Sequence, residues 1–181
     1  MPNEINSNAI RSRGGKGAGL DLIDRKILGE LSVSTDVGYA ELGERVGLSA
    51  PAVHERVKRL RAAGIIKRNV AIVDGPAVGK ALLAFVHVDT TGWGKTAGLM
   101  DLAVLPEIEE IHSVTGDTCM MLKVRVADSV ALEGLLAKLY DLPEVRGTRT
   151  YVVLSTYLER SPQPGITADL SNLQTLKPTS A

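Results

Sequence analysis

The most constraining feature of this sequence is a pair of amphipathic segments within residues 39–68, separated by only three residues, Gly-Leu-Ser at 47–49. Gly47 can adopt the left-handed conformation that ends a helix, and Ser49 can accept a hydrogen bond from a free N–H group at the start of the next helix. Pro51 falls in the first turn, where its missing N–H costs nothing. The sequence therefore predicts two helices joined by a tight turn.

The second of these segments has one apolar face and one basic face. Val53, Val57 and Leu60 recur at the i, i+4, i+7 spacing that lines one side of a helix. Residues 54–68 contain six Lys or Arg and one acidic residue, Glu55, and contacts to DNA phosphates need such a bias. The pattern is typical of a helix-turn-helix whose second helix enters the major groove. A helical hairpin with a solvated basic face is the alternative, and this segment alone favours neither.

We expect the helix at 50–63 to divide its DNA contacts between bases and phosphates. The side chains expected nearest to bases are Pro51, Ala52, His54, Glu55 and Lys58, with Ser49 as a further DNA-contacting residue at the helix start. The side chains expected nearest to phosphates are Arg56, Arg59, Arg61, Lys67 and Arg68. Glu55 can accept from a cytosine amino group, or it can simply repel phosphates.

Another helix is expected over residues 20–31, with Asp21 as its N-cap and Asp24 three residues further on. Its apolar stripe and those of the next two helices can close a small core, made of Ile23, Ile27, Leu31, Leu42, Val46, Val53, Val57 and Leu60. A unit of this size is hard to stabilise alone, so we expect contacts with a partner subunit to stabilise it. Residues 65–73 are β-branched and alternating, which predicts a strand.

The second half of the chain has a different pattern, with predicted strands and helices in the order β-α-β-β-α-β. The expected elements are strands at 82–89, 108–115, 119–126 and 145–158, and helices at 93–105 and 129–139. A weak internal repeat supports two copies of one unit, because Leu-Pro-Glu-Ile at 105–108 and Leu-Pro-Glu-Val at 142–145 each end a helix and begin a strand. This order is the ferredoxin-like arrangement.

Charge and cysteine content narrow the class of protein. Residues 1–80 carry 13 basic and 9 acidic side chains, whereas residues 81–181 carry 8 and 12, which fits a DNA-binding front half joined to a half with another role. A single cysteine, Cys119, excludes an intramolecular disulfide framework and a multi-cysteine zinc site. Without a secretory signal or an apolar run long enough to span a bilayer, we expect a cytoplasmic protein with no membrane contact.

No constellation in the sequence indicates an enzyme, a metal site or a cofactor. His54, His87 and His112 show no metal-ligand spacing with one another or with Cys119. Residues 81–158 offer no acid–base or nucleophile arrangement, so we expect no catalytic residue and no cofactor. An enzyme that uses this half for amino-acid chemistry is the alternative that this observation disfavours.

Four segments carry a resemblance to a known family. LDLIDRKILGEL, AELGERVGLSAPAVHERVKRLRAAGII, VDGPAVG and HSVTGDTCMMLKVRV together resemble the leucine-responsive regulatory protein/asparagine-synthetase regulator (Lrp/AsnC) family, also called feast/famine regulators, over about residues 20–158. The resemblance implies a bacterial or archaeal transcription regulator of the α+β class. It implies a C-terminal domain that forms oligomers and binds an amino acid or similar small effector.

The expected domain organisation follows from these patterns. It comprises a disordered arm at 1–19, a winged helix-turn-helix domain at 20–74, a hinge at 75–80, a ferredoxin-like effector-binding and oligomerisation domain at 81–158, and a flexible tail at 159–181. Apolar residues on both faces of the strands at 82–88 and 151–157 indicate pairing of sheet faces between two chains. We expect a homodimer as the minimal unit, built into a tetramer or octamer as the resemblance implies.

The resemblance places the effector pocket beside the turn between the strands at 108–115 and 119–126. It implies that Gly116 and Asp117 line the pocket, with Thr118 and Cys119 as further candidates. By spacing alone, Gly-Asp is more often an ordinary hairpin turn. The family often has Gly-acid-x-Asp-Tyr here, whereas this chain has Cys119 and Met120 at the last two positions, which indicates a more apolar pocket for a small or aliphatic amino acid.

The prediction for function is a sequence-specific DNA-binding regulator of amino-acid metabolism genes, modulated by a small effector such as an amino acid. Its expected partners are double-stranded DNA, that effector and further copies of the chain. The alternative is a nucleoid-associated architectural protein with little effector control. A large ratio of operator affinity to random-DNA affinity is expected only for the first.

Overall fold

Capping residues decide where the first helix begins. The structure is a computed structural model that describes residues 19–91 and 97–165. Helix α1 spans Leu22–Val33, two residues later at its start than predicted. The Asp21 side chain accepts a hydrogen bond from the backbone N–H of Asp24, and the Asp24 side chain accepts one from the backbone N–H of Asp21. This capping box confirms Asp21 as the N-cap.

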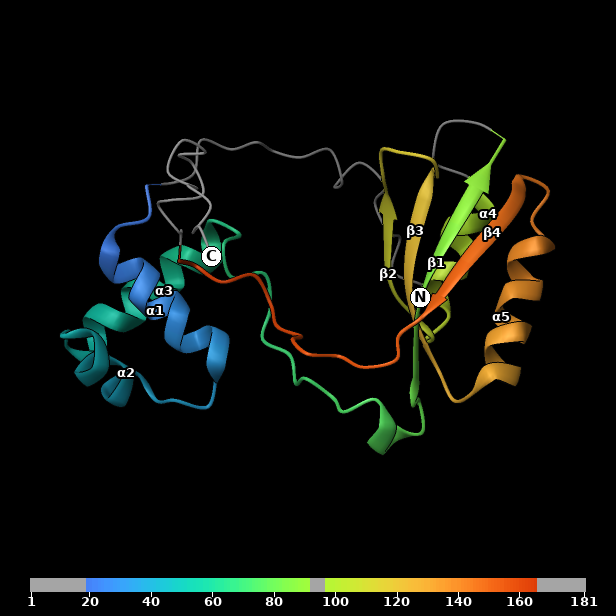
Figure 1. Ribbon diagram of the computed structural model, residues 1–181. Coiled ribbons are helices and arrows are strands. Elements are labelled where there is room, and N and C mark those ends of the chain that lie inside the picture. Colours follow the sequence, from blue (N-terminus) through green and yellow to red (C-terminus); the bar gives the residue numbers. More distant parts are fainter. Residues whose placement is uncertain (1–18, 92–96, 166–181) are drawn as a thin grey trace, which may run out of the picture. The chain divides into compact units, whose positions relative to one another are not determined.

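The tight turn between α2 (Tyr39–Val46) and α3 (Ala50–Ala62) is as the sequence predicts, except at Ser49 (Figure 1). Gly47 ends α2 in the left-handed conformation, with φ +74°. Ser49 occupies the N-cap position, but its side chain makes no capping hydrogen bond, so that prediction is wrong. Its backbone carbonyl instead accepts from Val53 N at 3.0 Å.

The three helices close a small apolar core, as predicted. Its fully or nearly fully buried members are Ile27, Leu42, Val46, Val53, Val57 and Leu60. Ile23 and Leu31 pack against the edge of this core and are only partly buried. The side chains of Val53, Val57 and Leu60 on α3 therefore face this core, and the other side chains of α3 are accessible to solvent or a ligand.

Residues 65–73 form no strand, and the prediction of one there is wrong. A strand needs a neighbour for its backbone hydrogen bonds, and the four strands of the described chain pair only with one another. Val70, Ile72 and Val73 stay exposed. The first unit therefore shows no wing strand, and a short 3-10 helix, η2 (Pro76–Val78), follows.

The second half forms one antiparallel sheet in the predicted β-α-β-β-α-β order. Its strands are β1 (Leu82–Thr90), β2 (Ile108–Ser113), β3 (Met120–Val126) and β4 (Val145–Val152), and they lie in the order β2-β3-β1-β4. The strand predicted to reach residue 158 ends at Val152. The helix predicted at 93–105 is α4 (Ala97–Asp101) followed by the 3-10 helix η3 (Leu102–Val104), and residues 93–96 lie outside the described residues.

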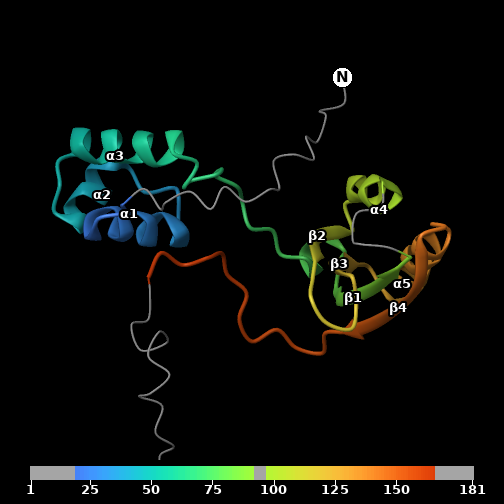
Figure 2. The same cartoon turned by 90° about the horizontal axis from the view of Figure 1, so that it is seen from above.

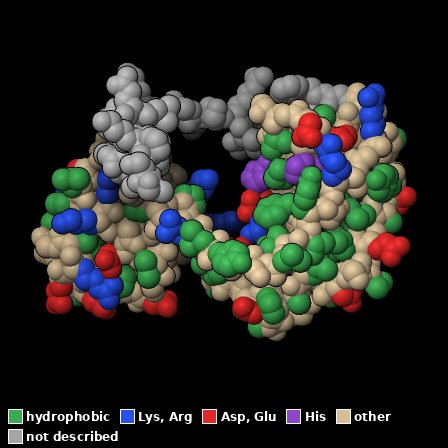
Figure 3. Space-filling view, viewed as in Figure 1, with side chains coloured by type: hydrophobic (Ala, Val, Ile, Leu, Met, Phe, Trp, Pro, Cys, Tyr) green, Lys and Arg blue, Asp and Glu red, His purple; other side chains and the backbone are tan. Residues whose placement is uncertain are grey.

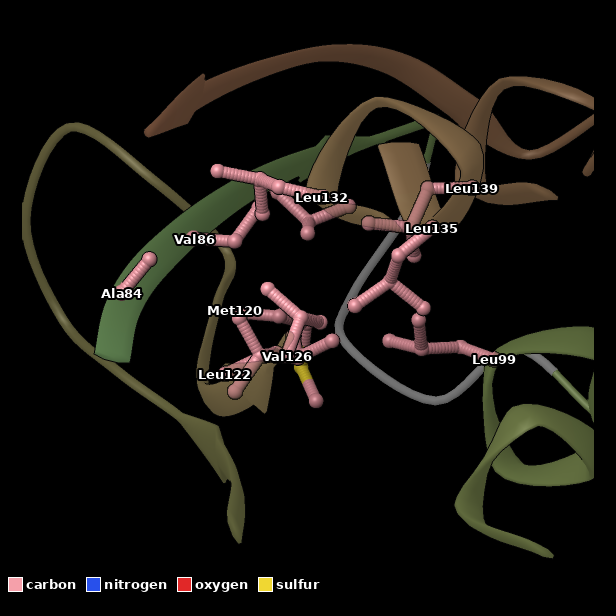
Figure 4. Close-up of a cluster of buried hydrophobic side chains, with 11 residues drawn as sticks. Ala84, Val86, Leu99, Met120, Leu122, Val126, Leu132, Leu135 and Leu139 are labelled. Carbon is pink, nitrogen blue, oxygen red and sulfur yellow. The ribbon is translucent and has the colours of Figure 1, made fainter. Parts of the chain in front are cut away.

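The helices α4 and α5 (Ser129–Tyr140) cover one face of this sheet (Figure 2). Alternate residues of β1 and β3 face them, and these pack with leucines of the two helices (Figure 4). The buried set is Ala84, Val86, Val88, Leu99, Met120, Leu122, Val124, Val126, Leu132, Leu135 and Leu139. No helix of the described residues lies over the opposite face of the sheet, and Figure 3 shows hydrophobic side chains gathered on that face.

By its internal contacts the chain divides into two units, residues 1–70 with 160–181 and residues 71–159. Residues 159–165, predicted as part of a flexible tail, make defined contacts within these units. Glu159 pairs with Lys123 and Arg125 in the second unit, and Arg25 Nη1 donates to the carbonyl of Pro164 at 2.5 Å in the first. The arm at 1–18 and the remaining tail at 166–181 lie outside the described residues.

Candidate nucleic-acid interface and effector turn

The outer face of α3 carries most of the residues predicted to contact DNA bases. Pro51, His54, Glu55 and Lys58 are exposed on this helix, Ser49 is exposed just before it, and Ala52 is half-buried. The placement follows from the inward turn of Val53, Val57 and Leu60, because helix periodicity sends the intervening side chains outward. The structure therefore brings the predicted base-contacting residues to one accessible surface of the first unit.

His54 is held on this surface by two neighbours. Its ring lies 5.4 Å from the ring of Tyr39, centroid to centroid, in a tilted arrangement. Its Nδ1 lies 3.5 Å from Oε1 of Glu55. Tyr39 is the first residue of α2, so this contact ties the exposed face of α3 to the preceding helix.

Arg56 and Arg59 differ from the other basic residues of α3 because they pair with carboxylates of the same unit. Nη1 of Arg56 lies 2.6 Å from Oδ2 of Asp21 and 2.8 Å from Oδ1 of Asp24. Nη2 of Arg59 lies 2.7 Å from Oδ2 of Asp24. The hydrogen bond to Asp21, and then the one to Asp24, raise the pKa of Arg56 above its ordinary value. No pattern along the chain indicates these pairs, because they join residues 32 to 35 positions apart.

The other predicted phosphate contacts, Arg61, Lys67 and Arg68, are exposed, as is Lys58, which is predicted to lie nearest to bases. Lys58 and Arg61 lie on α3, and Lys67 and Arg68 lie on the segment that follows it. Within the described ranges, these four make no salt bridge, in contrast to Arg56 and Arg59. Four free cations around one helix form the kind of surface that neutralises phosphates and releases their counterions.

The predicted effector turn lies between β2 and β3 and is closed by a hydrogen bond from Val114 N to Cys119 O at 3.1 Å. Gly116 has φ +130°, a conformation that other residues rarely adopt. Gly116 and Asp117 are exposed, whereas Cys119 is half-buried. Thr118 is buried, and its hydroxyl Oγ1 donates toward the carbonyls of Val88 at 3.2 Å and Met120 at 3.3 Å. The Thr118 hydroxyl is thus part of the support of the turn.

Arg149 of β4 holds this turn in place, and no pattern in the sequence points to it. Its Nη2 donates to the backbone carbonyl of Asp117 at 2.9 Å, and its Nη1 lies 3.4 Å from Oδ2 of the same residue. Nη2 also lies 3.7 Å from Oδ1 of Asp89 on β1. Only the pairing of β1 with β4 brings Arg149 to this end of the sheet. The turn therefore combines a guanidinium, a carboxylate and exposed backbone within a few ångströms.

The helix-free face of the sheet carries aromatic residues beside a network of charges. Phe85 and Tyr151 pair across β1 and β4, and both rings are exposed. Lys123 and Arg125 of β3 form ion pairs with Glu109. Burial would raise the pKa of Glu109, but hydrogen bonds from Arg125 and Lys123 outweigh it and lower that pKa.

Among the described residues, no group of three or more His, Cys, Asp or Glu side chains is placed to hold a metal ion. Over the same part of the chain, no helix is both long enough and apolar enough to cross a bilayer.

Sequence comparisons assign both units to one kind of protein. Residues 20–61 match the AsnC-type helix-turn-helix domain, and residues 83–163 match the Lrp/AsnC ligand binding domain. The chain is 36% identical over 145 residues to the HTH-type transcriptional regulator FL11 of Pyrococcus horikoshii, covering 80% of this chain and 96% of that one. It is 40% identical over 149 residues to the leucine-responsive regulatory protein of Escherichia coli K12, covering 80% and 91%.

Solved structures agree with these matches. The E. coli AsnC structure is 29% identical, with a TM-score of 0.71 over 80% of this chain and 98% of that one. A feast or famine regulatory protein from M. tuberculosis, complexed with L-methionine, is 35% identical, with a TM-score of 0.73 over 80% and 99%. A transcriptional regulator from Neisseria meningitidis, also in complex with L-methionine, is 28% identical, with a TM-score of 0.71 over 78% and 94%.

Proposed function

The chain belongs to the Lrp/AsnC family of transcriptional regulators, and on that premise we propose that it recognises specific duplex DNA with α3 and regulates genes of amino-acid metabolism under the control of an amino-acid effector. The observation that carries the proposal is the outer face of α3. It combines exposed polar side chains with free cations on a helix whose inner face is locked into a core.

In the proposed complex, α3 lies in the major groove. Pro51, Ala52, His54, Glu55 and Lys58 face base edges, and Ser49 sits at the start of the helix. The phosphate contacts on either side are Arg56, Arg59, Arg61, Lys67 and Arg68, and their charge makes the affinity fall as salt rises. Base contacts set the preferred sequence, whereas phosphate contacts set the strength for all sequences.

The proposed effector site is the turn at 114–119. The carboxylate of Asp117 suits the α-ammonium group of an amino acid, and the guanidinium of Arg149 suits its α-carboxylate. The half-buried thiol of Cys119 makes the neighbourhood apolar. Two related structures are complexes with L-methionine, which supports an amino acid as the effector and makes L-methionine a sensible first probe.

The proposed assembly is a homodimer in which the helix-free sheet faces meet, extended to a tetramer or octamer. Exposed Phe85 and Tyr151 give this face an apolar centre that a second copy can cover. A two-fold dimer also presents two copies of α3, which matches an operator with two half-sites.

The test is a binding measurement on two duplexes. One duplex is selected from random sequence by repeated binding to the protein, and the other is a scrambled duplex of equal length and composition. We expect affinity for the selected duplex to exceed that for the scrambled one by about 10³-fold or more at physiological salt. Equal affinities for both duplexes would instead support an architectural DNA-binding protein.

The effector is tested separately by a thermal-shift screen of the free amino acids, starting with L-methionine, followed by sizing with and without any hit. Stabilisation should grow with ligand concentration by mass action. A flat screen across all amino acids would remove the effector from the proposal and leave DNA binding intact.

A further inference from the structure

The buried carboxylate of Asp24 connects α1 to two arginines of α3. The Asp24 side chain is only 2% exposed. It accepts hydrogen bonds from Nη1 of Arg56 at 2.8 Å and from Nη2 of Arg59 at 2.7 and 2.8 Å. We call Asp24, Arg56, Arg59 and the capping residue Asp21 the bracket.

A carboxylate with so little exposure is costly unless it is paired and hydrogen-bonded. Here its partners are two guanidinium groups three residues apart on α3, which lie on the same side of a helix. Nη1 of Arg56 also bonds Asp21, the N-cap of α1, at 2.6 Å. The bracket therefore fixes both the rotation and the position of α3 relative to the start of α1.

Arg56 and Arg59 differ in how accessible their guanidinium groups are to DNA. The Arg56 side chain is 24% exposed, and one of its nitrogens already serves two carboxylates. Its lower exposure leaves less of Arg56 open to a phosphate, and turning the guanidinium outward would break two short charge-assisted hydrogen bonds. The Arg59 side chain is 60% exposed and is held through Nη2. A guanidinium has five N–H donors, so Arg59 keeps donors for a phosphate while Asp24 holds it.

We propose that Asp24 is a positioning residue for sequence recognition: it presents Arg59 to one phosphate at a fixed place, and it withdraws Arg56 from DNA contact. The inference rests on the proposed DNA-binding function and revises it at one residue, because Arg56 is no longer a phosphate contact. It also adds Asp24, an acidic residue, to the groups on which recognition depends.

A pure charge effect and a positioning role predict different results when Asp24 is changed. Asp24→Asn removes one negative charge beside a polyanion, so simple electrostatics predicts tighter binding to every duplex. If Asp24 positions α3 and Arg59, the same change lowers the preference for the selected duplex. The ratio of the two affinities therefore separates a positioning role from a mere charge effect.

The experiment measures the affinity of the full chain for the selected and the scrambled duplex over a series of salt concentrations, well below the melting temperature of each variant. Arg61→Ala and Arg59→Ala should each reduce the slope of log affinity against log salt by about 0.9, the value for one phosphate contact. Arg56→Ala should leave that slope unchanged. Asp24→Asn should lower the selected-to-scrambled ratio about tenfold, the order of one well-placed contact.

Glu30→Gln is the matched control. It also turns an acid of α1 into its amide and removes one negative charge, but the Glu30 side chain is 36% exposed and pairs with Arg45 on α2. We expect it to leave the selected-to-scrambled ratio unchanged. If Asp24→Asn unfolds, Arg59→Lys replaces it, because lysine keeps the charge without the planar fork of arginine. That variant should keep the salt slope and lower the ratio.

Two outcomes would overturn the inference while leaving the proposed function standing. In the first, Arg56→Ala reduces the salt slope as much as Arg61→Ala does. In the second, Asp24→Asn, or Arg59→Lys in its place, leaves the ratio at the wild-type value. A wild-type protein that prefers no duplex over another would overturn the proposed function itself, and the inference with it.

Discussion

At the start of α1, Asp21 caps the helix and also accepts a hydrogen bond from Arg56. The backbone hydrogen bond from Asp24 lowers the pKa of Asp21 most, and the Arg56 guanidinium lowers it further. The folded state therefore holds this carboxylate charged to a lower pH than the unfolded chain does, where its ordinary pKa is 3.8. Stability from this group is present above that ordinary pKa and is lost as pH falls through the lowered one.

Asp21→Asn tests this pH dependence. Asparagine is also a good N-cap, so the substitution removes the charge while keeping the cap. We expect the variant to melt below the wild type at neutral pH, and the gap to close between about pH 5 and pH 2 as the wild-type carboxylate is protonated. Thermal melts at a series of pH values measure it, and a gap that stays constant down to pH 2 would contradict it.

Arg149 is the residue whose change should affect the effector turn most. Arg149→Ala removes the hydrogen bond to the carbonyl of Asp117 and the neighbouring charge. We expect calorimetry to show at least about a tenfold loss of affinity for L-methionine or the best amino acid of the screen, since charge-assisted hydrogen bonds contribute on the order of 1.5–3 kcal/mol. Asp117→Ala should behave alike.

The free energy of unfolding of Arg149→Ala serves as a control for its effect on amino-acid binding. The Arg149 side chain is 43% exposed and that of Asp117 is 83% exposed, so their ion pair should add less than about 1 kcal/mol to the free energy of unfolding. An undiminished amino-acid affinity in both variants would show that this is an ordinary hairpin turn.

At the scale of elements, two glycines inside helices differ in how closely other atoms approach them. A Cβ on Gly43 in α2 would lie 2.4 Å from the backbone carbonyl oxygen of Leu48, in the turn before α3. A Cβ on Gly134 in α5 would meet nothing within 4 Å. Helix propensity favours alanine over glycine at both sites, but only α2 must let another segment approach its backbone.

Gly43→Ala and Gly134→Ala therefore form a matched pair. We expect Gly134→Ala to raise the free energy of unfolding by up to about 1 kcal/mol. Gly43→Ala should lower it, because the turn that begins α3 must shift, and should weaken binding to the selected duplex. Chemical denaturation and duplex binding measure both effects. Stabilisation by Gly43→Ala would contradict the close approach at Leu48.

At the scale of the whole molecule, the helix-free face of the sheet is the surface that the proposed dimer covers. Phe85 lies beside Lys123 in the register of β1 and β3. A glutamate at 85 is therefore acceptable in the separate chain, where it faces a cation across the strands. In a dimer that buries this position, an added carboxylate is costly.

Phe85→Glu should therefore convert the dimer to a monomer at micromolar concentration while the sheet stays folded. Light scattering gives the mass, and circular dichroism gives the fold. Val130→Asp, on the exposed side of α5 where Val130 is 74% exposed, is the control and should leave the assembly unchanged. A Phe85→Glu protein with the wild-type mass would show that the sheet faces do not form the interface.

Much of the fold could be predicted because its signals are local. The capping box at Asp21, the left-handed Gly47 and the apolar spacing of Val53 and Val57 all involve residues within four positions of one another. The β-α-β-β-α-β order follows from alternation within each segment. The strand predicted at 65–73 failed because alternation describes what a segment can form, whereas a strand also requires a partner.

The sequence by itself therefore determined the helices, the order of the strands along the chain and the exposed polar face of α3, since hydrophobic periodicity and caps act over one or two turns. Only the tertiary structure decided which charges of that face are free. Asp24 is 32 residues from Arg56, and Asp117 is 32 residues from Arg149, so no pattern along the chain links them. Packing brings each pair together, because an ion pair depends on distance in space and on burial.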